Sequence, residues 1–217
     1  MLRQWSGACQ AYSLDMQVQW QTSLFADGEV QADSEFASLQ HHVLDRTAWL
    51  DHAPGWLHGA DTLFQELLGD APWEESTQEL YGRVVVTPRL VARWRFPDDA
   101  SRLPPILEEL RRLLQARYAR AFDSVGANLY RDGRDSVAWH GDRIPRSIVN
   151  PIVATVSLGH ARRFLMRPRE GRTQLSLMLG AGDLVVMGGT SQRTWQHAIP
   201  KVASAGPRIS LAFRHSV

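Results

Sequence analysis

The stretch Asn128-Leu-Tyr-Arg-Asp-Gly-Arg-Asp-Ser-Val-Ala-Trp-His-Gly-Asp142 decides how the rest of the chain is interpreted. Apolar and polar residues alternate on both sides of Asp132-Gly133, which predicts a β-hairpin with a glycine-containing turn. On the second strand, His140 and Asp142 stand two residues apart, so both side chains point to the same face. An imidazole and a carboxylate in this arrangement, roughly 7 Å apart at Cα, can chelate one metal ion.

A second histidine completes the set of candidate metal ligands. His197 lies 57 residues after His140. Two imidazoles and one carboxylate form the facial triad that binds Fe(II) and leaves coordination positions open for a co-substrate and oxygen. The chain has a single cysteine, Cys9, so we expect no internal disulfide and no thiolate ligands.

The last predicted strand, Arg208–Arg214, has two chemically different faces. Its alternation places Ile209, Leu211 and Phe213 on one face and Arg208, Ser210, Ala212 and Arg214 on the other. Two arginines on the inner face of a terminal strand would be costly without anionic partners. A dicarboxylate co-substrate would supply those partners.

These motifs, in this order and spacing, resemble the AlkB family of Fe(II)/2-oxoglutarate dioxygenases. The resemblance rests on N-x-Y at 128–130, H-x-D at 140–142, Gly182-Asp-Leu-Val-Val-Met-Gly-Gly189, His197 and R-x5-R at 208–214. It covers about residues 40–217. It implies His140, Asp142 and His197 as ligands of Fe(II). It also implies that 2-oxoglutarate is bound by Asn128, Tyr130, Arg208, Ser210 and Arg214, with Ser210 standing where family members often have Asn.

The same resemblance implies an α+β, mainly β fold, with a double-stranded β-helix or jelly-roll core and N-terminal helices packed outside. Helical periodicity predicts helices near residues 56–68 and 103–122, and alternation predicts strands at 12–20, 43–50 and 84–90. Many short strands with glycine-rich turns follow from Gly126 onward. We expect an N-terminal extension at 1–40 and a dioxygenase domain at 41–217, with its jelly-roll core at about 126–217.

Charge is unevenly distributed along the chain. Residues 1–80 contain two basic and 13 acidic residues, whereas residues 81–217 contain 22 basic and ten acidic residues, a balance of +12. Such asymmetry favours a polyanionic partner, although a solvated arginine-rich surface would look the same. Arg89 and Trp94 lie where the family forms a lid over the substrate base, so both are candidate nucleic-acid contacts. The alternative is a packed tryptophan beside solvated arginines.

The function that we expect is oxidative demethylation of alkylated bases in DNA or RNA, with a single-stranded or flipped base as substrate. Arg143 stands where DNA-repair members usually have an acidic residue that reads the base. An arginine cannot accept a hydrogen bond from a base amino group, so we expect base recognition to differ, with Arg143 as a candidate substrate contact.

Two rival functions remain open. One is hydroxylation of a protein or a small molecule on the same fold. The other is non-catalytic nucleic-acid binding, which the triad and both arginines argue against. No apolar run is long enough to span a bilayer, and no secretory signal is evident. We therefore expect a cytoplasmic monomer with no membrane partner.

Overall fold

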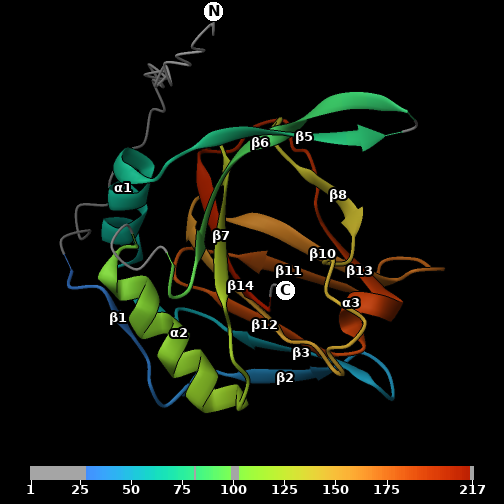
Figure 1. Ribbon diagram of the computed structural model, residues 1–217, viewed down its shortest axis with the longest axis horizontal. Coiled ribbons are helices and arrows are strands. Elements are labelled where there is room, and N and C mark those ends of the chain that lie inside the picture. Colours follow the sequence, from blue (N-terminus) through green and yellow to red (C-terminus); the bar gives the residue numbers. More distant parts are fainter. Residues whose placement is uncertain (1–27, 81, 99–102, 216–217) are drawn as a thin grey trace, which may run out of the picture.

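The computed structural model describes residues 28–80, 82–98 and 103–215, whose strands form two facing antiparallel sheets (Figure 1). In this described part, the larger sheet has eight strands, in the order β2 (Gln40–Val43), β3 (Ala48–Ala53), β12 (Leu184–Gly189), β9 (Val153–Gly159), β14 (Arg208–Arg214), β7 (Ser124–Tyr130), β6 (Arg83–Arg95) and β5 (Glu74–Leu80). The smaller sheet has the order β11 (Leu175–Leu179), β10 (Arg162–Pro168), β13 (Trp195–Ile199) and β8 (Val137–His140). A short pair joins β1 (Gln31–Ala32) to β4 (Leu57–His58).

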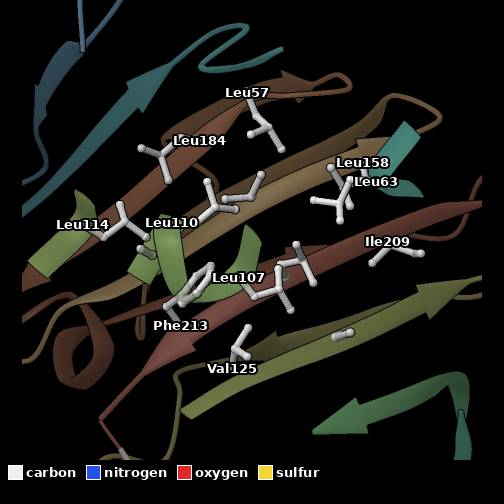
Figure 2. Close-up of a cluster of buried hydrophobic side chains, with 14 of the residues drawn as sticks. Leu57, Leu63, Leu107, Leu110, Leu114, Val125, Leu158, Leu184, Ile209 and Phe213 are labelled. Atoms are coloured by element: carbon white, nitrogen blue, oxygen red, sulfur yellow. The ribbon is translucent and has the colours of Figure 1, made fainter. Parts of the chain in front are cut away.

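Two helices pack against the outer face of the larger sheet. These are α1 (Ala60–Asp70) and α2 (Pro105–Tyr118), and α2 begins with a proline, whose missing N–H costs nothing at that position. Figure 2 shows the core that results, in which leucines of both helices meet Ile209 and Phe213 of β14. Both helices lie where the sequence predicted them, and they cover the sheet from outside as expected.

A second apolar core fills the space between the two sheets. Leu50 and Met187 of the larger sheet pack there with Phe164, Met166 and Trp195 of the smaller sheet. Two antiparallel sheets packed face to face form the expected jelly roll. The short helix α3 (Ser191–Thr194) links β12 of the larger sheet to β13 of the smaller sheet.

The prediction of a β-hairpin around Asp132-Gly133 is wrong, because the two strands on either side of this turn do not pair with each other. β7 pairs with β14 and β6 in the larger sheet, whereas β8 pairs with β13 in the smaller sheet. The connection between them crosses from one sheet to the other and is folded locally, because Asp135 accepts hydrogen bonds from the backbone and guanidinium of Arg131. A Cβ on Gly133 would lie 2.4 Å from the carbonyl oxygen of Val202, so the glycine serves close packing here rather than a hairpin turn.

Strand β6 is longer than the sequence predicted. We expected a strand over residues 84–90, but β6 runs from Arg83 through Pro88 to Arg95. Its pairing with β5 is irregular near Pro88, since Thr77 lies opposite Val86 and Glu75 lies opposite Leu90. A bulge accommodates the missing proline N–H within a continuous strand. The β5–β6 hairpin extends beyond the rest of the fold at the upper right of Figure 1.

The segment assigned to an N-terminal extension is described only in part. The strand predicted at residues 12–20 lies outside the described residues. Ala32 and Phe36 are buried in the core beneath the helices, and Trp56 donates its indole N–H to the carbonyl oxygen of Asp33, so the described residues before position 40 pack against the domain.

Among the described helices, none has the length and apolar character that a membrane span requires.

Candidate metal and co-substrate site

One cavity between the sheets brings together all the residues that the sequence predicted for metal and 2-oxoglutarate. β7 and β14 supply one wall, and β8 and β13 supply the facing wall. The predicted residues that line the cavity are Asn128, Tyr130, His140, Asp142, His197, Arg208, Ser210 and Arg214. Residues at separate places in the sequence therefore share one surface, as the motif order predicted.

The three candidate metal donors are neighbours. His140 at the end of β8 lies directly opposite His197 of β13, and their ring centroids are 4.2 Å apart. The Oδ2 atom of Asp142 lies 3.9 Å from Nε2 of His197, and it is buried without a hydrogen-bond partner in the described residues. Nδ1 of His140 lies 2.9 Å from the carbonyl oxygen of Ala138. A proton on Nδ1 would fix the ring and leave Nε2 as the donor atom.

The donors are close together but are not yet converged on one point. No three His, Cys, Asp or Glu side chains in the described ranges form a ready metal cluster. The other carboxylate oxygen of Asp142, Oδ1, accepts a hydrogen bond of 2.9 Å from Nε of Arg214. The set of two imidazoles and one buried, unpaired carboxylate oxygen fits a facial-triad ion such as Fe(II).

The protonation states of the donors also suit a metal ion. Burial opposes ionisation of Asp142, but attraction to Arg214 and to both histidines outweighs it, and the pKa of the carboxyl lies below its ordinary value. Burial, together with repulsion from His140, lowers the pKa of His197 to about 3. At neutral pH the carboxylate is therefore charged and the His197 imidazole is neutral, as metal ligation requires.

Arg208 is the most unusual cation of the cavity. Its side chain is 1% exposed, and Nε and Nη2 donate to the hydroxyl of Ser157 at 3.1 and 2.6 Å. Nη1 is buried and has no hydrogen-bond partner among the described residues. The guanidinium lies over the ring of Tyr130, 5.3 Å from its centroid, and burial lowers the pKa of Arg208. A buried guanidinium with a free N–H is suited to an anionic ligand.

Asn128 and Ser210 lie opposite each other on β7 and β14. Arg89 of β6 donates from Nε to Oδ1 of Asn128 at 2.9 Å and lines the same cavity. The sequence assigned Arg89 to nucleic-acid contact at a lid. The structure places its guanidinium beside a predicted co-substrate residue.

The other two candidate substrate contacts lie outside the cavity. Trp94 is 3% exposed and packs in the helix-covered core, so the expected nucleobase contact is wrong for this side chain. The alternation of β6 explains this, because Leu90, Ala92 and Trp94 all point to the helix side. Arg143 is exposed in the loop after Asp142 and remains a candidate contact.

Several residues at the site were missed from the sequence. On β9, Thr155 lines the cavity, and Ser157 accepts hydrogen bonds from the guanidinium of Arg208. Their signal was the polar residue at every second position of an otherwise apolar strand. Phe164 of β10 stacks on the His197 ring, with centroids 5.5 Å apart, and no local motif marked it.

Comparisons with known proteins agree with this geometry. Residues 57–214 match the 2OG-Fe(II) oxygenase superfamily. The chain is 35% identical over 182 residues to alpha-ketoglutarate-dependent dioxygenase alkB homolog 3 of Bos taurus, which covers 74% of this chain and 64% of that protein. It is 31% identical over 191 residues to DNA oxidative demethylase ALKBH2 of Arabidopsis thaliana, with 70% and 61% covered. The solved structure of OsALKBH1 shares the fold, with a TM-score of 0.56, 15% identity, and 82% and 100% covered.

The chain therefore belongs to the 2OG-Fe(II) oxygenase superfamily. Members of this family use Fe(II) and 2-oxoglutarate. The matched part of the chain spans a little under two thirds of the length of these curated relatives.

Proposed function

We propose that this protein is an Fe(II)- and 2-oxoglutarate-dependent dioxygenase that oxidatively demethylates alkylated bases in DNA or RNA. In this reaction O₂ and 2-oxoglutarate are consumed, and succinate, CO₂ and formaldehyde are released. Bound Fe(II) supplies the oxidising chemistry that converts an N-methyl group into a hydroxymethyl group, which leaves as formaldehyde.

The observation that carries the proposal is a pair of buried polar atoms in one cavity, one anionic and one cationic, that have no hydrogen-bond partner among the described residues. Oδ2 of Asp142 is an anionic donor beside His197, and Nη1 of Arg208 is a cationic donor without a partner in the described residues. Burying either group unpaired is costly unless a ligand completes it. A metal ion and a dicarboxylate would complete both.

In this proposal each residue of the cavity has a distinct task. His140, Asp142 and His197 hold the metal ion. Arg208, oriented by Ser157, binds the distal carboxylate of 2-oxoglutarate. Arg214 holds Oδ1 of Asp142, which fixes the carboxylate plane and leaves Oδ2 for the metal.

Remaining contacts to 2-oxoglutarate come from the larger sheet. We assign these to Asn128, Tyr130 and Ser210, which line the cavity beside Arg208. The hydrogen bond from Arg89 to Asn128 orients the Asn128 amide, so that its NH₂ group is free to donate to a carboxylate.

Nucleic acid is the substrate class that the charge distribution and the relatives favour. Residues 81–217 carry a balance of +12, and almost all of their basic residues are arginines, which suit phosphate contacts. A relative named DNA oxidative demethylase also supports this assignment. A methylated base in a duplex would have to flip out to reach the cavity, whereas a single strand would not.

The test is an incubation with Fe(II), ascorbate and 2-oxoglutarate and a panel of methylated oligonucleotides, followed by mass spectrometry. The panel contains single- and double-stranded DNA and RNA with 1-methyladenine or 3-methylcytosine, and the Asp142→Ala variant is the control. We expect one substrate to lose the mass of a CH₂ unit with the unaltered protein only.

Two other results would contradict the proposal in different ways. Succinate formation without any change in an oligonucleotide would retain the oxygenase and reject the nucleic-acid substrate, in favour of a protein or small molecule. Failure to bind a divalent metal would reject the oxygenase itself.

A further inference from the structure

The carboxylate ligand Asp142 is not held by a β-ladder. Strand β8 ends at His140, two residues earlier, so Asp142 lies in the loop that follows. Its backbone N–H donates instead to the side-chain carbonyl of Gln192 at 2.8 Å. This bond links the H-x-D segment to the short helix α3, which lies in the connection between β12 and β13.

Gln192 is itself held firmly. Its side chain is 3% exposed, and Nε2 lies 3.4 Å from the sulfur of Met187 in β12. The helix is fixed at both ends, because Thr190 N donates to the carbonyl oxygen of Thr47 and the Trp195 indole donates to Asp45. A buried amide with both ends engaged can impose a position on the backbone that it contacts.

Gly141 provides a second contact with the same residue. A Cβ at this position would lie 2.3 Å from the backbone oxygen of Gln192, which is closer than real Cβ atoms approach. The backbone of the middle residue of H-x-D therefore rests directly on α3. Any side chain at position 141 would push the loop away from the helix.

The loop beyond Asp142 is held by the next residue of α3. Nη2 of Arg193 donates to the carbonyl oxygens of Pro145 and Ile148 at 3.3 and 2.5 Å. The helix thus contacts the loop before, at and after the carboxylate. With the loop held in this way, Oδ1 of Asp142 accepts a hydrogen bond from Arg214, and Oδ2 lies 3.9 Å from Nε2 of His197.

We propose that Gln192 is a positioning residue for the metal-binding carboxylate. Its side-chain carbonyl fixes the Asp142 backbone, and its backbone carbonyl supports Gly141, so that Oδ2 faces the two imidazoles. This inference rests on the proposed function, because it assumes that Asp142 ligates the metal. It assigns to α3 a task in metal affinity that a purely structural linker would not have.

The experiment measures metal affinity apart from turnover, by titrating Mn(II) into the metal-free protein in a calorimeter. Gln192→Leu keeps the size of the side chain and removes the acceptor oxygen. Because partners of metal ligands typically contribute about 10–100-fold to affinity, we expect a loss in that range. Gly141→Ala should cause a comparable loss by displacing the same loop.

Two matched variants separate positioning from folding. Gln192→Glu keeps an acceptor oxygen at the same reach and should recover most of the lost affinity. Ser191→Ala changes the neighbouring buried residue of α3, whose hydroxyl has no hydrogen-bond partner among the described residues, and should leave affinity unchanged. Thermal melting of the metal-free variants shows whether each of them folds.

The outcomes are distinguishable. If unaltered protein binds one Mn(II) and folded Gln192→Leu binds it equally well, the inference is overturned and the proposed function stands. If Gln192→Leu fails to fold, Gly141→Ala decides, and unchanged affinity of that variant overturns the inference. If unaltered protein binds no metal, the proposed function and the inference both fall.

Discussion

Replacing Arg208 by methionine tests the co-substrate site most directly, because it should affect binding and stability in different ways. Arg208 is buried, its Nε and Nη2 donate to the Ser157 hydroxyl, and its Nη1 has no hydrogen-bond partner among the described residues. Methionine fills a similar volume without the charge. We expect 2-oxoglutarate affinity to fall strongly while the metal-free protein remains folded.

The magnitudes follow from these contacts. Removing one partner of a buried, hydrogen-bonded charge pair costs about 2–5 kcal/mol, which is a loss of affinity of roughly 30-fold to several thousand-fold. Two effects on the free energy of unfolding oppose each other. Without Arg208 the buried Ser157 hydroxyl loses its donor, which costs about 1–3 kcal/mol. The substitution also removes a buried cation that has no anionic partner, a change that is often neutral or stabilising. We expect the free energy of unfolding to change by less than about 2 kcal/mol.

Arg162→Met is a matched control. Arg162 is also buried, and its guanidinium also lies near Tyr130, 5.8 Å from the ring centroid. Its Nη1 and Nη2 donate to the backbone oxygens of Asp132, Asp135 and Pro200, so it holds loops together, and its Nε has no partner among the described residues. Because its removal takes the donor from three separate backbone oxygens, at about 1–3 kcal/mol each, it should destabilise the fold by about 3 kcal/mol or more.

The assay combines titration of 2-oxoglutarate into Mn(II)-loaded protein with urea denaturation of metal-free protein. Arg208→Met should lose affinity at nearly constant stability, and Arg162→Met should lose stability. An Arg208→Met protein that binds 2-oxoglutarate normally but unfolds easily would refute the assignment and make Arg208 a structural residue.

Three further perturbations test other parts of the structure. Asp142→Ala should abolish Mn(II) binding in calorimetry with an unchanged circular dichroism spectrum, and wild-type affinity would exclude Asp142 as a ligand. Trp94→Ala should lower the free energy of unfolding in urea by about 3–5 kcal/mol, because it empties a core position, and a loss below about 1 kcal/mol would contradict that burial. Acid should destabilise the metal-free protein between pH 6.5 and about 3, since the pKa of His197 is lowered to about 3 in the folded state and the unfolded chain binds the proton first. Denaturation at several pH values should give a slope of up to about 1.4 kcal/mol per pH unit from this group. His197→Gln should flatten that slope, whereas a slope that persists in His197→Gln would rule out His197 as its source.

The candidate site could be predicted largely from the sequence because its signals are local or ordered. Alternation alone placed Ile209, Leu211 and Phe213 on the core face of β14 and Arg208 and Ser210 on the other face, as the structure confirms. A strand has a period of two whatever it pairs with, so this prediction needs no partner. The jelly roll followed from the resemblance and the strand-rich second half.

Partner choice could not be predicted in the same way. The hairpin expected around Asp132-Gly133 failed because β7 and β8 find their neighbours in β14 and β13, far along the chain. The local sequence indicates that two strands exist, but it does not indicate which strands from distant parts of the chain will pair with them. The resulting gain in long-range packing outweighed the local turn signal.

The roles of individual side chains divide along the same line. Motif order marked His140, Asp142 and His197 without knowledge of the fold. Only the tertiary structure placed Trp94 in the core, Arg89 beside Asn128 and Gln192 against Asp142. Those placements join elements that are remote in sequence, and which donor meets which acceptor is decided when the two sheets and α3 pack together.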